Sequence, residues 1–167
     1  MLHNGRDVEY PIELRRRFNN PSTADSEGWL TRCNLERFLN TTFGLSLADI
    51  YGTNVFPFIK SGGVSRRIPA RDLIKAALEF ALPQIEIVKP RLVFCLGLVT
   101  FDALRRSVGL PLAGRMNLAI DSPFTVGESQ VWCQAHTGAF GQMNRNRGDS
   151  DRAARDWMKM KEDFVGV

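Results

Sequence analysis

The fold is decided by the stretch LVFCLG at residues 92–97. Five apolar residues in a row, closed by a glycine, are typical of a strand that is buried on both faces of a mostly parallel sheet. An amphipathic helical pattern precedes this stretch, and a second helical pattern follows it from about residue 99 to residue 108. A buried strand between two helices indicates an α/β protein.

Two helices are predicted before this strand. The first covers residues 28–41, and Gly44 just beyond it would stop the helix. The second begins at Pro69, a residue type that is common at the first position of a helix, and its apolar residues recur at intervals of three and four up to Leu82. Pro83 should kink this helix, which then continues for about one further turn.

Other segments complete the predicted sheet. The sequence IYGTNVFPFI at residues 50–59 predicts a short strand, and residues 124–135 predict a hairpin with a Gly-Glu turn. Residues 149–164 predict a terminal amphipathic helix. We therefore expect one domain over residues 1–167, with an irregular segment at residues 1–28. Its fold should be a three-layer α/β/α sandwich around a central, mostly parallel four-stranded sheet.

Charge and cysteine content narrow the class of protein. The chain has 22 Lys and Arg against 18 Asp and Glu, a net charge of +4, which permits a polyanionic partner. Arginines gather at residues 15–17, at 66–67 and at 145 and 147; a solvated surface is the alternative explanation for each group. Cys33, Cys95 and Cys133 lie far apart, which fits reduced thiols and indicates no metal site.

The sequence carries no secretion signal and no apolar run of transmembrane length. We expect a monomeric protein of the cytosol, or of the nucleus in a eukaryote, that does not associate with membranes.

Asn54 lies in the strand predicted over residues 50–59, two residues before Phe56. A carboxamide offers a donor and an acceptor side by side, which suits the Watson–Crick edge of a pyrimidine that has been turned out of a duplex. An asparagine that caps a turn or ties two loops together is the alternative. We take Asn54 and Phe56 as candidate base-binding residues.

A second motif is AHTGAFGQMNRNRG at residues 135–148. Its glycines allow a tight backbone that approaches a phosphate closely, its arginines offer charge, and Phe140 or Met143 is suited to act as an apolar wedge in a base stack. His136 opens this segment and is a candidate site residue; a hydrogen-bonded core histidine is the alternative. We expect a loop that contacts DNA through Gly138, Phe140, Gln142, Met143, Asn144, Arg145 and Arg147.

Residues 29–157 resemble the uracil-DNA glycosylase superfamily. The resemblance rests on YGTNV at residues 51–55, on IVKPRLVFCLG at residues 87–97, and on the segment that His136 opens. It implies that Asn54 reads the uracil, and that His136 contacts a base carbonyl and stabilises the negative charge on the leaving uracil. It also implies that a side chain among Phe140, Gln142 and Met143 enters the duplex where the base has left.

The sequence departs from the family pattern in three places. The opening Gly-x-x-Pro-type motif, which positions the attacking water, is not found; we expect the chain to begin just beyond it, and Asp7 is the candidate substitute. The iron–sulfur branch of the family uses four cysteines, and three scattered ones do not meet that pattern, so no cofactor is expected. His-Thr-Gly at residues 136–138 replaces the commoner His-Pro-Ser, which leaves the base specificity open.

The implied activity is that of a DNA glycosylase. It would flip uracil or a related deaminated base out of DNA and hydrolyse its N-glycosidic bond, with electrostatic stabilisation of the departing anion. One alternative is a catalytically inactive DNA- or nucleotide-binding module of the same fold. Another is a flavodoxin-like domain that binds a phosphate ligand through Ser61, Gly62 and Gly63.

Overall fold

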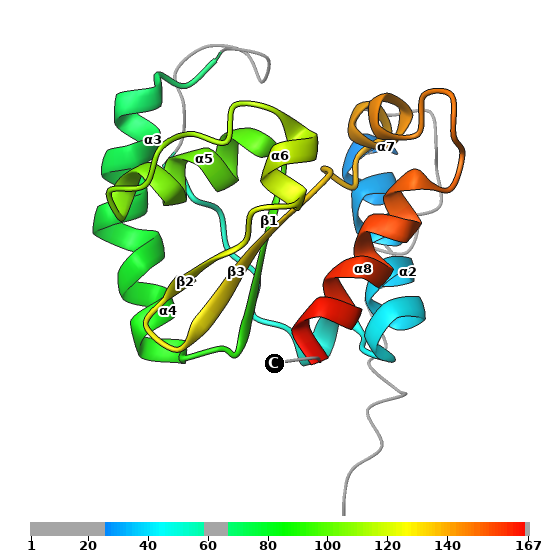
Figure 1. The fold of residues 1–167 in the computed structure, drawn as a ribbon, viewed down its shortest axis with the longest axis horizontal. Helices are drawn as coiled ribbons and strands as arrows, with labels where there is room; N and C mark the ends of the chain where they lie inside the picture. The colour runs from blue at the N-terminus through cyan, green and yellow to red at the C-terminus, as the bar shows by residue number, and fades with distance from the viewer. Residues whose placement is uncertain (1–25, 59–66, 166–167) are drawn as a thin grey trace, which may run out of the picture.

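The computed structural model describes residues 26–58 and 67–165 and centres on a three-stranded mixed sheet (Figure 1). The strands are β1 (Leu92–Leu96), β2 (Phe124–Val126) and β3 (Ser129–Gln134), in the order β1-β3-β2. β1 runs parallel to β3, so that Cys95 pairs with Cys133. β2 and β3 form the predicted hairpin, and its turn contains Gly127 at a φ of 57°.

The prediction of a four-stranded, mostly parallel sheet is wrong for the described residues. Residues 50–58 form no strand; they are irregular chain after α2 (Ser26–Phe43) and a 3₁₀ turn at Leu47–Asp49, and α3 (Ala70–Ala76) comes later in the chain. Gly52 and Pro57 interrupt this stretch, and a proline cannot donate a hydrogen bond to a sheet. The hairpin adds an antiparallel strand, so the sheet is mixed.

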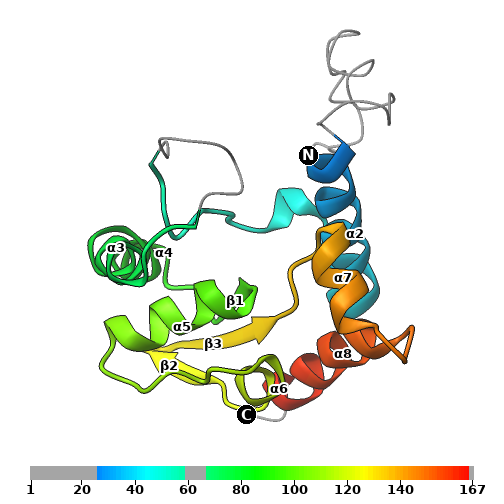
Figure 2. The same ribbon diagram turned by 90° about the horizontal axis from the view of Figure 1, so that it is seen from above.

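Helices cover both faces of the sheet, as predicted (Figures 1 and 2). On one face α2 and α8 (Arg152–Val165) pack against Trp132 and Phe94. On the other face the turn at Ala77–Ala81, α4 (Leu82–Val88), α5 (Leu98–Ser107) and α6 (Met116–Ile120) form one apolar cluster with Val131 and Cys133, and α3 packs against α5. Side chains alternate between the faces of a strand, and this alternation gives the sheet its two separate apolar layers.

The helix predicted from Pro69 onward is continuous through Val88 but contains a π turn at Ala77–Ala81. The backbone N–H of Leu82 donates to the carbonyl of Ala77, five residues back. Pro83 lacks an N–H, and its ring would clash with the carbonyl four residues earlier in a regular helix. The wider π turn therefore accommodates Pro83 within the helix.

Within the two described ranges, no helix combines the length and apolar character needed to cross a membrane.

Candidate functional site at the carboxyl edge of the sheet

β1 and β3 end side by side at one edge of the sheet. The backbone N–H of Gly97 donates to the carbonyl of Gln134 over 2.7 Å, which extends the pairing by one residue beyond β1. Gly97 has a φ of 104°, a conformation that favours glycine, and a Cβ there would lie 3.9 Å from the Cβ of His136. The carboxyl edge of the sheet therefore brings His136 against the end of β1.

His136 is exposed, so the alternative of a buried core histidine is wrong. Its Nδ1 lies 3.0 Å from the backbone N of Gly138. A backbone N–H always donates, so Nδ1 must accept, and the neutral imidazole then carries its proton on Nε2. The side chain makes no further hydrogen bond with a described residue, which leaves this N–H available as a donor.

The segment expected to be a loop contains a short helix, α7 (Ala139–Arg145), and two glycines let it fold tightly onto His136. A Cβ on Gly138 would lie 2.9 Å from Nδ1 of His136, and a Cβ on Gly141 would lie 2.1 Å from its carbonyl oxygen. The side chain of Gln142 donates to the same carbonyl over 3.1 Å. The glycines therefore set the position of the helix relative to the imidazole.

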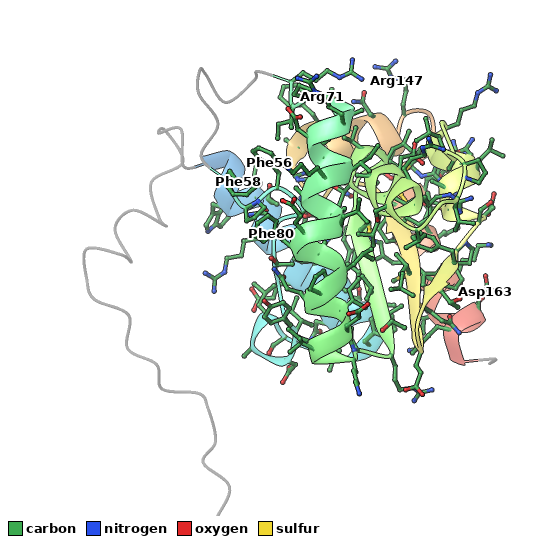
Figure 3. All side chains as sticks on the ribbon, turned by 90° about the vertical axis from the view of Figure 1, so that its left-hand side faces the viewer. Phe56, Phe58, Arg71, Phe80, Arg147 and Asp163 are labelled. Atoms are coloured by element: carbon green, nitrogen blue, oxygen red, sulfur yellow. The ribbon has the colours of Figure 1, made fainter. Side chains whose placement is uncertain are left out.

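α7 presents an apolar outer face. Phe140 is 67% exposed and Met143 is 57% exposed, and residues three apart lie on the same side of a helix. Asn144 is exposed beside them, and Arg147 is exposed just beyond the helix. Figure 3 shows Arg147 at the same end of the molecule as Arg71 of α3. Phe140, Met143, Asn144 and Arg147, which we expected to meet DNA, are thus all exposed on or next to α7, and Arg71 adds a cation that was not singled out from the sequence.

Arg145 points the other way, into the protein. Its Nη2 donates to Oδ1 of Asp156 over 2.8 Å and its Nε donates to Oδ2, while its Nη1 donates to Asn117. Only 9% of the Arg145 side chain is exposed. This guanidinium forms an internal contact between helices, and of the two arginines predicted to contact phosphate only Arg147 is exposed.

Asn54 lies in the irregular segment between α2 and α3, and its exposed carboxamide makes no hydrogen bond with a described residue. The alternative of a capping or loop-tying asparagine therefore finds no support within the described residues. Phe56 is half-buried, and its ring meets the edge of Phe58 at 5.2 Å; Phe58 in turn meets Phe80 at 5.1 Å (Figure 3).

Several predicted site residues lie outside the described ranges. They are Asp7, the arginines at residues 15–17, Arg66, and the glycines of the Ser-Gly-Gly loop at residues 61–63.

The cysteines do not fit a metal cluster. Cys95 and Cys133 are adjacent on β1 and β3 and are buried, whereas Cys33 is half-buried on α2. Burial raises the pKa of the Cys95 thiol, and it raises the pKa of Cys133 to about 12, so both thiols stay protonated at neutral pH. In the described part of the chain, no three His, Cys, Asp or Glu residues are grouped to hold a metal ion.

The family model described as "Uracil DNA glycosylase superfamily" matches residues 14–159. The chain belongs to the uracil DNA glycosylase superfamily. A "Type-4 uracil-DNA glycosylase" of Pyrobaculum aerophilum is 35% identical over 66 residues, which are 40% of this chain and 32% of the relative. The match thus spans about a third of that protein. No solved structure matches the chain.

Sequence reasoning missed residues that position the site of this superfamily member. The side chain of Asn34 on α2 donates to the carbonyl of Thr137 over 2.9 Å and so ties the start of the chain after β3 to α2. Gly97 and Asp156 were also missed. Gly97 had a signal, since a glycine directly after a buried strand often marks a close approach of backbone, but Asp156 looked like any charged residue of a surface helix.

Proposed function

We propose that this protein is a DNA glycosylase that removes uracil or a related deaminated base from DNA. The observation that carries the proposal is His136, an exposed imidazole at the end of β3 whose Nδ1 accepts from Gly138. The Nε2–H that remains is a preset donor for negative charge developing on a carbonyl oxygen of the leaving base. Membership of the superfamily and the partial likeness to a type-4 enzyme support this assignment.

The other roles follow from exposure and chemistry. The carboxamide of Asn54 is exposed and unpaired among the described residues, so it is available to recognise the edge of a flipped base. Phe56, two residues further along the chain, would contact the same base. Phe140 and Met143 on α7 would enter the base stack, and Arg147 would contact a backbone phosphate. We assign the positioning of the attacking water to Asp7, which lies outside the described residues.

Release of free uracil from a U·G duplex by the purified protein tests the proposal. His136→Ala and Asn54→Ala should each reduce the rate by roughly 100-fold, since each removes a group that contacts the reacting base. Asn40→Ala, at an exposed asparagine of α2, is the matched control and should keep the wild-type rate. Asp7→Asn tests the assignment of the water-activating carboxylate.

A catalytically inactive module that binds DNA is the other function of the same fold. It predicts duplex binding by the wild-type protein with no release of uracil, hypoxanthine or any other deaminated base. That result would overturn the glycosylase proposal.

A further inference from the structure

The inward-facing contacts of Arg145 join three helices. Arg145 belongs to α7, Asp156 to α8 and Asn117 to α6, and we call these three residues the Arg145 clamp. The Arg145 and Asp156 side chains are 9% and 11% exposed. A planar guanidinium that binds both oxygens of one carboxylate fixes orientation as well as distance.

Further contacts brace the clamp. The side chain of Gln134, at the end of β3, lies with its Nε2 3.3 Å from the carbonyl of Asp156. Arg152 of α8 donates to the same Asn117 oxygen over 3.2 Å, and the Asn146 side chain accepts the N–H of Ala153 over 2.8 Å. The carboxyl end of α7 is thus bound to α8 and α6 by side chains, and α8 is in turn bound to the last strand through Gln134. The amino-terminal half of α7 rests on the backbone of His136.

The clamp and the exposed apolar residues lie on different sides of α7. At 100° per residue, Arg145 is about 200° around the helix from Met143 and about 140° from Phe140. The exposures agree, because Phe140 and Met143 are 67% and 57% exposed. A single seven-residue helix therefore has one side fixed in the protein and the other side offered to a partner.

We propose that the Arg145 clamp positions α7 so that Phe140 and Met143 can enter a DNA duplex, and that Arg145 and Asp156 are positioning residues for base flipping. This inference rests on the proposed function. The wedge must displace stacked bases against a cost of a few kcal/mol per step, so a helix that yields under that load would flip bases poorly. A single-stranded substrate has no stack to open, so its cleavage should depend far less on the clamp.

The contacts of the Arg145 clamp require the planar guanidinium group of an arginine, which donates to several acceptors at once. Asp156→Asn removes the carboxylate from the bidentate pair, and Arg145→Lys keeps the charge but cannot reach two oxygens and Asn117 with one ammonium group. Asp121→Asn is a matched control, because Asp121 pairs with Lys159 of the same helix α8 over 3.2 Å without touching α7. Thermal unfolding and circular dichroism establish that each variant is folded.

The test uses a duplex with 2-aminopurine next to the uracil, whose fluorescence rises when the neighbouring base unstacks, whether or not the glycosidic bond breaks. At saturating protein, wild type and Asp121→Asn should give the full rise, and Asp156→Asn and Arg145→Lys should lose most of it. Uracil release from the duplex should fall roughly tenfold to 100-fold in the clamp variants, whereas release from a single strand should fall about twofold or less.

The outcomes separate the two proposals. Unstacking by wild type without any uracil release would overturn the glycosylase function and leave the clamp proposal standing. Equal unstacking by wild type and Asp156→Asn, or no unstacking by wild type, would overturn the clamp proposal. Equal losses on duplex and single-stranded substrates would also overturn it, since they would show a general effect on the site and no specific effect on the wedge.

Discussion

The backbone N–H of Gly138 donates to Nδ1 of His136 over 3.0 Å, and this one bond decides which nitrogen of the imidazole can donate to a ligand. The bond forms because the chain turns back on itself directly after β3, with α7 beginning at Ala139. Histidine function thus depends here on a backbone group two residues away.

The neutral form of His136 should carry its proton on Nε2. Two-dimensional ¹⁵N–¹H spectra of the imidazole distinguish the two tautomers, and the neutral ring should show the Nε2–H pattern. An Nδ1–H pattern for the neutral ring would contradict the hydrogen bond from Gly138.

Gly138→Ala should impair the site without unfolding the protein. The added methyl would lie 2.9 Å from Nδ1 of His136 and 3.0 Å from the Thr31 hydroxyl, so the imidazole must move. We expect uracil release to fall roughly 100-fold, as displaced reacting groups commonly cost. Gly28→Ala is the control: no atom lies within 4 Å of its added Cβ, so activity should persist. Its stability should rise by about 0.5–1 kcal/mol. Wild-type activity in Gly138→Ala would show that the position of the His136 imidazole does not depend on a glycine at residue 138.

The double variant Phe140→Ala/Met143→Ala should separate activity from stability. Both side chains are more than half exposed, so the free energy of unfolding should change by about 0.5 kcal/mol or less. Uracil release from duplex DNA should fall on the order of tenfold or more, because no apolar group would fill the stack. Met158→Ala, at a 41% exposed methionine of α8, should leave both quantities unchanged. A double variant as active as wild type would exclude α7 as the wedge.

The buried thiols predict a loss of stability at alkaline pH. The pKa of Cys133 is raised to about 12 by burial, and burial also raises the pKa of Cys95, whereas an unfolded chain releases such protons near pH ~8.5. The folded chain therefore binds more protons in this window, and the free energy of unfolding falls as the pH rises from about 9 toward 12. Denaturant titrations at several pH values measure this slope.

Cys133→Ala should reduce the alkaline slope, and Cys33→Ala, at a half-buried position, should not. A thiol reagent should also modify Cys33 in the native protein before the other two. If the free energy of unfolding falls equally steeply with pH in Cys133→Ala and Cys33→Ala, the buried thiols on β1 and β3 do not cause the pH dependence.

Trp157 should be among the most costly side chains to remove. It stacks on Phe38 with ring centroids 5.2 Å apart, meets the edge of Phe94 at 5.1 Å, and is 1% exposed. Trp157→Ala should lower the free energy of unfolding by about 3–5 kcal/mol in a denaturant titration. Trp29→Ala, at a 42% exposed position, should cost much less. A loss of less than about 1 kcal/mol in Trp157→Ala would mean that the apolar layer between the sheet and helices α2 and α8 contributes little to stability.

The sequence predicted those elements that carry their own periodic pattern. The run at residues 92–96, the hairpin around Gly127 and the helix from Pro69 to Val88 were all found, because local spacing or turn chemistry determines each. The strand predicted over residues 50–59 was wrong within the described residues. A strand needs a partner, and the sequence alone does not say whether one is beside it.

The sequence indicated which residues belong to the candidate site, but it did not indicate which residues they contact. His136 stood out because it follows an apolar strand, and α7 was missed because Gly138 and Gly141 look like loop residues. The inward direction of Arg145 had no local signal, since Asn117 lies 28 residues before it and Asp156 lies 11 residues after it. Such contacts depend on how the helices pack, which no motif records.

The close packing of α7 against His136 affects the entropy cost of binding a partner. Gly141 lets the helix rest on the backbone of His136, and Arg145 fixes its other end, so the segment loses its conformational entropy when the chain folds. Little of that entropy remains to be lost on association, which favours affinity without new contacts. We therefore expect α7 to keep its conformation on binding, so that most of the conformational change occurs in the partner.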